Sequence, residues 1–121
     1  MSRHILTIDD SPSMRMLLKA SLTAQGFIVS SAEDGAQGLA AAKAAPPDLI
    51  ITDINMPVMD GFELIEAARA DSDLRLLPIL VLSTEFSDDK KARARSAGAT
   101  GWITKPFEAD KLAAAIRRVC P

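Results

Sequence analysis

The sequence has few residues suited to disulfide, zinc–thiolate or aromatic-stacking chemistry. Among its 121 residues are one cysteine, no tyrosine and only 4% aromatic residues. The single cysteine, Cys120, cannot form an intramolecular disulfide, and no zinc motif is present. The scarcity of aromatic rings also argues against a site that stacks a flavin.

Long hydrophobic runs and a strong charge of one sign are absent as well. No apolar stretch approaches the ~20 residues needed to cross a bilayer. The formal net charge of −2 disfavours nonspecific binding to nucleic acids or anionic membranes. The N-terminus enters a β-rich run directly, without a signal-peptide pattern. These features predict a cytoplasmic protein that binds neither nucleic acid nor membrane.

The sequence does contain a regular alternation of short β-rich runs and helical patterns. The predicted strands are His4–Asp9, Phe27–Ser31, Leu49–Asp53, Pro78–Ser83 and Gly101–Thr104. The runs at residues 49–51 and 79–82 are almost wholly apolar, which is typical of parallel strands covered on both faces. Five strand–helix units fill residues 1–121 without room for a linker. We therefore predict a single α/β domain with a doubly wound parallel sheet.

The helical patterns between the strands differ in strength. In the first, Ser11 is the expected cap and Pro12 the first helical residue. The expected inward face comprises Met14, Leu17, Leu18 and Leu22. The last helix has the clearest amphipathic pattern, with Leu112, Ala115, Ile116 and Val119 on one face. The fourth helix, at residues 87–97, is the weakest, because it offers only alanines to a core.

Polar, chemically capable residues follow four of the five predicted strands. The first strand ends at Asp9-Asp10, the third at Asp53, the fourth at Ser83-Thr84 and the fifth at Lys105-Pro106. In a parallel sheet the carboxyl ends of the strands meet at one edge, where ligands bind. We therefore expect three carboxylates, a hydroxyl and an ammonium to share one site.

The clustered carboxylates predict a bound cation. At ~4 Å and an effective dielectric of ~20, each pair of like charges costs about 4 kcal/mol. Mg²⁺ would offset this repulsion, since it binds one or two carboxylates and accepts phosphate oxygens; Mn²⁺ suits the same ligands. Asp53, on a central strand, is the best candidate nucleophile for an aspartyl phosphate. Lys105 and Ser83 could bind the phosphoryl oxygens.

Simpler interpretations of the same residues stay open at this point. An aspartate at a strand end often caps a loop or helix, and Asp9-Asp10 could merely cap the first helix. Lys105 could be an ordinary surface lysine in a turn. Periodicity and spacing alone therefore predict a phosphate and Mg²⁺ site, and no more.

The motifs together resemble the receiver domain of two-component response regulators. The resemblance covers the whole chain and is carried by Asp9-Asp10-Ser11, the run from Asp53 to Gly61, Ser83, and Lys105-Pro106-Phe107. The stand-alone chemotaxis type, CheY-like, is the most similar, because of Ser13-Met14-Arg15, Leu82-Ser83-Thr84-Glu85 and Gly98-Ala99-Thr100-Gly101-Trp102. The resemblance implies a flavodoxin-like (βα)5 fold with strand order 2-1-3-4-5.

The resemblance also implies roles for the residues of the site. Asp53 would accept a phosphoryl group from the phosphohistidine of a sensor histidine kinase. Asp10, Asp53 and the Asn55 carbonyl would bind Mg²⁺ directly, and Asp9 through water. Lys105 would contact the phosphoryl group, and its bond to Pro106 is similar to one that is cis in the family.

The resemblance further implies a switch that links the site to a binding surface. Ser83 would move toward the phosphoryl group and Trp102 would follow, although the family usually has Tyr or Phe at that position. Thr84, Glu85 and Asn55 are expected to tune hydrolysis of the phosphoryl group. The output face would lie on the fourth helix, fifth strand and fifth helix, with the basic residues Lys90, Lys91, Arg93 and Arg95 and with Trp102.

The expected activity is that of a phosphorylation-controlled binding module, not of a dedicated enzyme. A basic output face favours an acidic protein partner, such as a flagellar motor switch or a relay protein, bound by a monomer. A phosphorelay intermediate or phosphate sink is the alternative. An aspartyl phosphatase is disfavoured, because Asn55 stands where such enzymes carry a general acid. The first strand–helix turn lacks the glycines of a flavodoxin-type phosphate loop.

Overall fold

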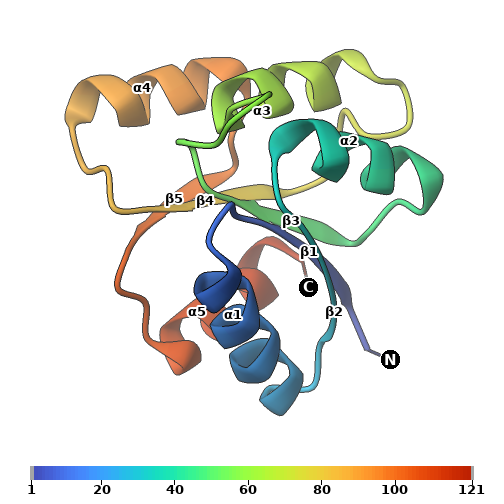
Figure 1. The fold of residues 1–121 in the computed structure, drawn as a ribbon, viewed down its shortest axis with the longest axis vertical. Coiled ribbons are helices and arrows are strands. Elements are labelled where there is room, and N and C mark those ends of the chain that lie inside the picture. Colours follow the sequence, from blue (N-terminus) through green and yellow to red (C-terminus); the bar gives the residue numbers. More distant parts are fainter. Residues whose placement is uncertain (1, 121) are drawn as a thin grey trace.

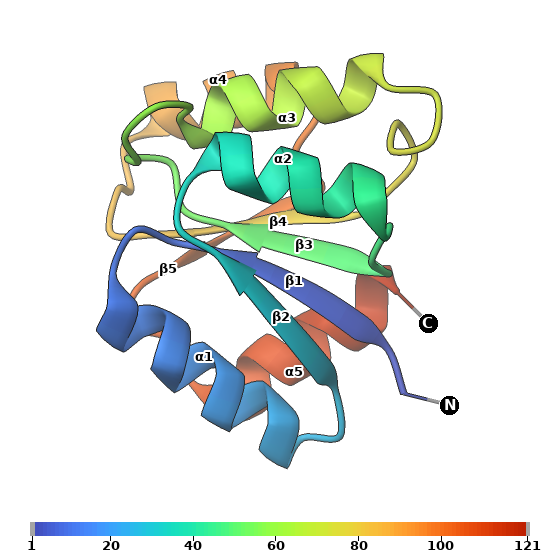
Figure 2. The ribbon, with the colours of Figure 1, turned by 45° about the vertical axis from the view of Figure 1, so that its right-hand side comes forward.

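The computed structural model describes residues 2–120, which form a three-layer α/β domain (Figures 1 and 2). The strands are β1 (His4–Ile8), β2 (Ile28–Ala32), β3 (Leu49–Thr52), β4 (Ile79–Ser83) and β5 (Gly101–Thr104). The helices are α1 (Pro12–Ala24), α2 (Gly35–Ala44), α3 (Gly61–Ala70), α4 (Asp88–Ala97) and α5 (Ala109–Val119). In the described part of the chain, no helix is long and apolar enough to cross a membrane.

The five strands are parallel and lie in the order β2-β1-β3-β4-β5, which confirms the predicted topology. Helices α2, α3 and α4 cover one face, and α1 and α5 cover the other (Figure 2). Every residue of β3 and β4 is buried. This explains their uninterrupted apolar sequences, because a strand covered on both faces has no solvent-facing side.

Each face of the sheet supports its own hydrophobic cluster. Ile50, Ile65 and Val81 belong to the cluster beneath α2, α3 and α4. Leu18 and Ile116 belong to the cluster beneath α1 and α5. Two clusters on opposite faces hold the sheet as a rigid layer, which keeps the carboxyl ends of its strands in a fixed arrangement.

The three helices whose patterns differ in the sequence bury their predicted faces to different extents. Leu112 and Ile116 of α5 are buried, and Ala115 and Val119 are partly buried, as predicted. The prediction for Leu17 of α1 was wrong, because its side chain is 50% exposed. Helix α1 contacts β1, β2 and α5 at one edge of the sheet, so only a narrow stripe of the helix is covered. Helix α4 buries a single residue, Ala94, which agrees with its weak apolar pattern.

One backbone position in the β3–α3 loop is strained. Val58 has φ +67° and is 82% exposed. A β-branched side chain in this left-handed region costs roughly 1–2 kcal/mol, whereas asparagine tolerates it. We expect Val58→Asn to raise the free energy of unfolding by about 1 kcal/mol in urea denaturation. Leu76→Asn is the control, because Leu76 is 86% exposed without a positive φ. An unchanged or lower stability of the Val58 variant would contradict this account of the strain.

Candidate functional site

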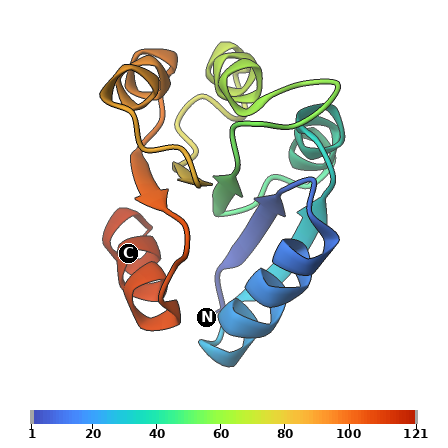
Figure 3. The ribbon, with the colours of Figure 1, turned by 60° about the vertical axis from the view of Figure 1, so that its left-hand side comes forward.

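The register of the central strands brings the sequence-predicted acidic residues together. Ile8 of β1 lies beside Thr52 of β3, so Asp9 and Asp53, the next residues along each strand, emerge side by side. The backbone N–H of Asp53 also donates to the Ile8 carbonyl oxygen at 2.9 Å. The loops after these strands open on the same edge of the sheet (Figure 3).

Asp9, Asp10 and Asp53 form an acidic cluster at that edge. Each offers a carboxylate oxygen, and the three oxygens lie within 4.8 Å of one another. Asp9 is buried, Asp53 is half-buried and Asp10 is exposed. A set of hard oxygen donors with one open side suits Mg²⁺, which keeps part of its water shell. The donor chemistry of the cluster therefore fits the predicted cation.

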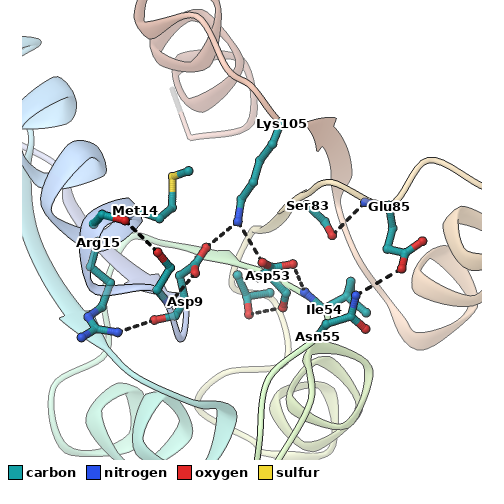
Figure 4. A network of polar contacts seen from close by, with 12 residues as sticks. Asp9, Met14, Arg15, Asp53, Ile54, Asn55, Ser83, Glu85 and Lys105 are labelled. Atoms are coloured by element: carbon teal, nitrogen blue, oxygen red, sulfur yellow. Dashed lines mark hydrogen bonds and ion pairs between the residues drawn. The ribbon is translucent and has the colours of Figure 1, made fainter.

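Lys105, after β5, supplies the only positive charge seen in contact with these carboxylates in the described structure. Its Nζ lies 2.7 Å from Asp9 Oδ2 and 2.9 Å from Asp53 Oδ2 (Figure 4). Burial opposes the charge and would lower the pKa of Lys105, but the hydrogen bonds to Asp53 and Asp9 outweigh it and raise that pKa above its ordinary value. The peptide bond between Lys105 and Pro106 is cis, as the resemblance implied.

The Asp53 carboxylate is held at both oxygens. Its Oδ1 accepts a hydrogen bond from the Ile54 backbone N–H at 2.6 Å, and its Oδ2 accepts from Lys105. Each carboxylate oxygen has two lone pairs, so one of each remains for another ligand. The side chain is thus oriented while its oxygens stay available for chemistry.

Ser83 lies near Asp53 (Figure 4), but its hydroxyl makes no hydrogen bond to the acidic cluster. Ser83 is completely buried, and its Oγ accepts a hydrogen bond from the Glu85 backbone N–H at 3.2 Å. Thr84 is exposed. The structure therefore places the Ser83 hydroxyl against its own loop and not against Asp53.

Glu85 connects four parts of the molecule. Its Oε1 accepts hydrogen bonds from Asn55 Nδ2 at 3.2 Å and from Lys90 Nζ at 2.9 Å. Its backbone carbonyl accepts from Trp102 Nε1 at 3.1 Å. The pKa of Glu85 is lowered, chiefly by the hydrogen bond from Lys90 and then by that from Asn55. The β4–α4 loop is thereby linked to β5, to α4 and to the loop that follows Asp53.

Comparison with known protein families accounts for this combination of fold and residues. Residues 5–117 match the family described as the response regulator receiver domain. The chain belongs to this family. Membership makes it a phospho-accepting signalling domain and not a dedicated enzyme, as the sequence predicted.

Two chemotaxis relatives match this receiver domain along nearly their whole length. The chemotaxis protein CheY of Pseudomonas aeruginosa is 37% identical over 116 residues, which cover 95% of this chain and 94% of that protein. The structure of Vibrio cholerae CheY4, also a chemotaxis protein, superimposes with a TM-score of 0.93 and is 43% identical, covering 98% of this chain and 99% of that one. The chain spans only about half the length of the mycobacterial transcriptional regulatory proteins that it matches.

The metal expectation also has support from a related receiver domain. The receiver domain of the Pseudomonas aeruginosa sensor histidine kinase PA1611 carries a magnesium ion coordinated in its active-site cleft. It is 27% identical, with a TM-score of 0.92 and coverage of 99% of this chain and 98% of that one. Together with the Asp9, Asp10 and Asp53 cluster, this shows that Mg²⁺ is the cofactor of the receiver domain.

The basic residues expected on the output face of this receiver domain divide into two groups. Lys91, Arg95 and Trp102 line a groove of about 330 Å³ between α4 and β5. Lys90 instead pairs with Glu85, and the Arg93 guanidinium lies 4.0 Å from the centre of the Phe62 ring on α3. The structure therefore brings only part of the basic run together with Trp102.

Sequence reasoning assigned no role to one residue beside the acidic cluster. Arg15 of α1 donates from Nη1 to the Asp9 backbone carbonyl at 2.7 Å (Figure 4). The signal in the sequence was a cation in the first turn of a helix, where the helix dipole disfavours positive charge.

Proposed function

We propose that this receiver domain takes a phosphoryl group from the phosphohistidine of a sensor histidine kinase onto Asp53. The observation that carries the proposal is the Lys105 ammonium bridging Asp53 and Asp9 within the acidic cluster. As the P–O bond to Asp53 forms, the N–P bond breaks and the imidazole nitrogen retains its electron pair. The receiver thus stores the group as an aspartyl phosphate.

Each neighbouring residue then has a distinct part in the transfer. Asp10, Asp53 and the Asn55 carbonyl are the proposed direct ligands of Mg²⁺, and Asp9 acts through water. When bound, Mg²⁺ neutralises negative charge on the transferring group. Lys105 stabilises a phosphoryl oxygen by a charge-assisted hydrogen bond, in addition to neutralising the carboxylates.

Phosphorylation puts a phosphoryl group of roughly −1.5 to −2 charges in place of the single negative charge of the Asp53 carboxylate, and so can bias the loop that follows Ser83. A Ser83 hydroxyl that turns to a phosphoryl oxygen no longer accepts from the Glu85 N–H. Glu85 in turn contacts Lys90 of α4 and Trp102 of β5. A full switch from 1:99 to 99:1 requires about 5.5 kcal/mol of differential stabilisation. Two or three charge-assisted hydrogen bonds to the phosphoryl group would supply most of it.

The proposed output is binding of an acidic protein partner at the groove between α4 and β5. Small residues, including Ala94 and Ala99, line part of the groove, while Lys91 and Arg95 supply positive charge. Similarity to chemotaxis proteins over the whole chain favours a cytoplasmic role in chemotaxis, with the flagellar motor switch as partner. A phosphorelay intermediate or phosphate sink is the alternative.

The output proposal predicts phosphorylation-dependent binding to the flagellar motor switch protein of the same organism. We expect beryllofluoride with Mg²⁺, which mimics the phosphoryl group, to strengthen binding about tenfold in a fluorescence titration. A Lys91→Glu, Arg95→Glu double variant should lose this binding, since it reverses the charge of the groove. Lys19→Glu on α1, on the opposite face of the sheet, is the matched control. Equal binding with and without beryllofluoride would favour the relay or sink.

A further inference from the structure

The peptide bond between Asp9 and Asp10 is held by a cation outside the acidic cluster. Arg15 Nη1 donates to the Asp9 carbonyl oxygen, which belongs to this peptide group, at 2.7 Å. The Asp9 side chain is anchored separately, because Oδ1 accepts from the Ser11 N–H at 2.9 Å and Oδ2 accepts from Lys105 at 2.7 Å. Asp9 therefore has three anchors from three different residues.

Asp10 has no comparable anchor. Among residues 2–120, its exposed carboxylate has no hydrogen-bond or ion-pair partner. Its direction therefore depends on the backbone, and rotation of the Asp9–Asp10 peptide plane would swing it away from Asp9 and Asp53. Since Mg²⁺ demands near-octahedral geometry, the orientation of this peptide plane bears directly on metal binding.

The placement of Arg15 is electrostatically unfavourable in itself. It lies in the first turn of α1, which contains no acidic residue, and the positive end of the helix dipole repels a cation there. A Mg²⁺ ion held by the Asp9, Asp10 and Asp53 carboxylates would add further positive charge near Arg15. A residue that acted only by charge would weaken Mg²⁺ binding, so its removal would tighten that binding.

We infer that Arg15 is a positioning residue for the Mg²⁺ site: by fixing the Asp9–Asp10 peptide plane, it aims the Asp10 carboxylate at the metal. In other proteins, mutating a residue that orients a metal ligand typically lowers metal affinity by about 10- to 100-fold. The inference rests on the Mg²⁺ site formed by the three carboxylates.

The test is an NMR titration of ¹⁵N-labelled protein with MgCl₂. In Arg15→Met, which keeps the aliphatic stem but has no donor, we expect Mg²⁺ affinity to fall about tenfold. The Asp10 amide nitrogen should shift before any metal is added, because it shares the peptide group with the Asp9 carbonyl. Arg15→Lys, which keeps a cationic donor, should recover part of the affinity. Lys19→Met, one turn along α1, is the control for loss of a positive charge.

Each outcome decides the matter. Unchanged or tighter Mg²⁺ binding in a folded Arg15→Met variant would overturn the proposal, because a purely electrostatic role predicts that sign. Arg15→Gln serves as a second neutral variant, and loss of folding in both would make Arg15 a structural residue instead. If the wild-type protein bound no Mg²⁺, the proposed metal site itself would be wrong. If wild type bound Mg²⁺ and the Arg15 variants bound it with the same affinity, only the role of Arg15 would be wrong.

Discussion

Replacing Asp53 with asparagine is expected to abolish phosphorylation of this receiver domain. The wild-type protein, incubated with acetyl phosphate and Mg²⁺, should gain the mass of one phosphoryl group by intact mass spectrometry, and Asp53→Asn should gain none. An amide oxygen is too weak a nucleophile to displace the donor. If the asparagine keeps its oxygen toward the Ile54 N–H, its NH₂ group takes the place of Asp53 Oδ2. That group is a donor and faces the Lys105 ammonium, from which Asp53 Oδ2 accepts a hydrogen bond in the wild-type protein.

Two controls separate loss of the acceptor from loss of the metal. Chelating Mg²⁺ with EDTA should suppress the adduct in the wild-type protein. Asp10→Asn keeps Asp53 but removes a proposed ligand, so its adduct should return at higher Mg²⁺ concentration. An adduct of the same mass and yield on Asp53→Asn would show that another residue accepts the phosphoryl group, and the proposed function would then fail.

Replacing Lys105 with methionine is expected to have opposite effects on metal binding and on phosphoryl transfer. Lys105 lies within 2.9 Å of both Asp9 and Asp53, so removing its charge leaves the carboxylates free for Mg²⁺, which should bind more tightly. The rate of phosphorylation by acetyl phosphate should nevertheless fall by on the order of 10²- to 10³-fold, because a hydrogen-bond donor to the transferring group is lost. Mg²⁺ titration and time-resolved mass spectrometry measure the two effects.

The pH dependence of the Lys105 ion pairs has a defined sign. The pKa of Lys105 is raised in the folded protein from an ordinary value of 10.5. Its contribution to stability is therefore fully present below that value and is lost only as the pH rises through the higher, folded-state pKa. The difference in unfolding free energy between wild type and Lys105→Met should be constant around neutral pH and shrink in strong alkali.

The opposite effects predicted for Lys105→Met also have a contradicting outcome. If the variant lost both Mg²⁺ affinity and phosphorylation, the role of Lys105 as a competitor of the metal and a donor to the phosphoryl group would be wrong.

Much of the architecture could be predicted from the sequence, because buried parallel strands leave an unmistakable apolar pattern. The strands predicted at residues 49–53 and 78–83 form at residues 49–52 and 79–83, where every residue is buried. The predicted ends of two strands were each one residue too late. Asp9 and Asp53 were assigned to strands that in the structure end at Ile8 and Thr52. Leu17 was wrongly expected inside, because periodicity identifies a helical face but not how wide a stripe the sheet will cover.

The chemical identity of the site was also visible before its geometry. Aspartates, a serine and a lysine after successive strands predicted a metal and phosphate site, and the family match agrees with it. The contacts of individual side chains were not visible. The sequence presented Lys90 and Arg93 as part of one basic surface, whereas the structure pairs Lys90 with Glu85 and stacks Arg93 on Phe62. A one-dimensional pattern shows charge, but not the partner that neutralises it.

The sequence by itself determined the fold class, the order of strands and helices, and which functional groups the strand ends carry. Those features depend on local periodicity and on residue type, which are read directly from the chain. Only the tertiary structure decided which groups meet: Lys105 reaches Asp9 across 96 residues, and Ile8 is in register with Thr52. It also placed Arg15 against the Asp9 carbonyl, the contact that we propose directs Asp10. Such contacts depend on angstrom-scale packing of the whole domain, which no local segment encodes.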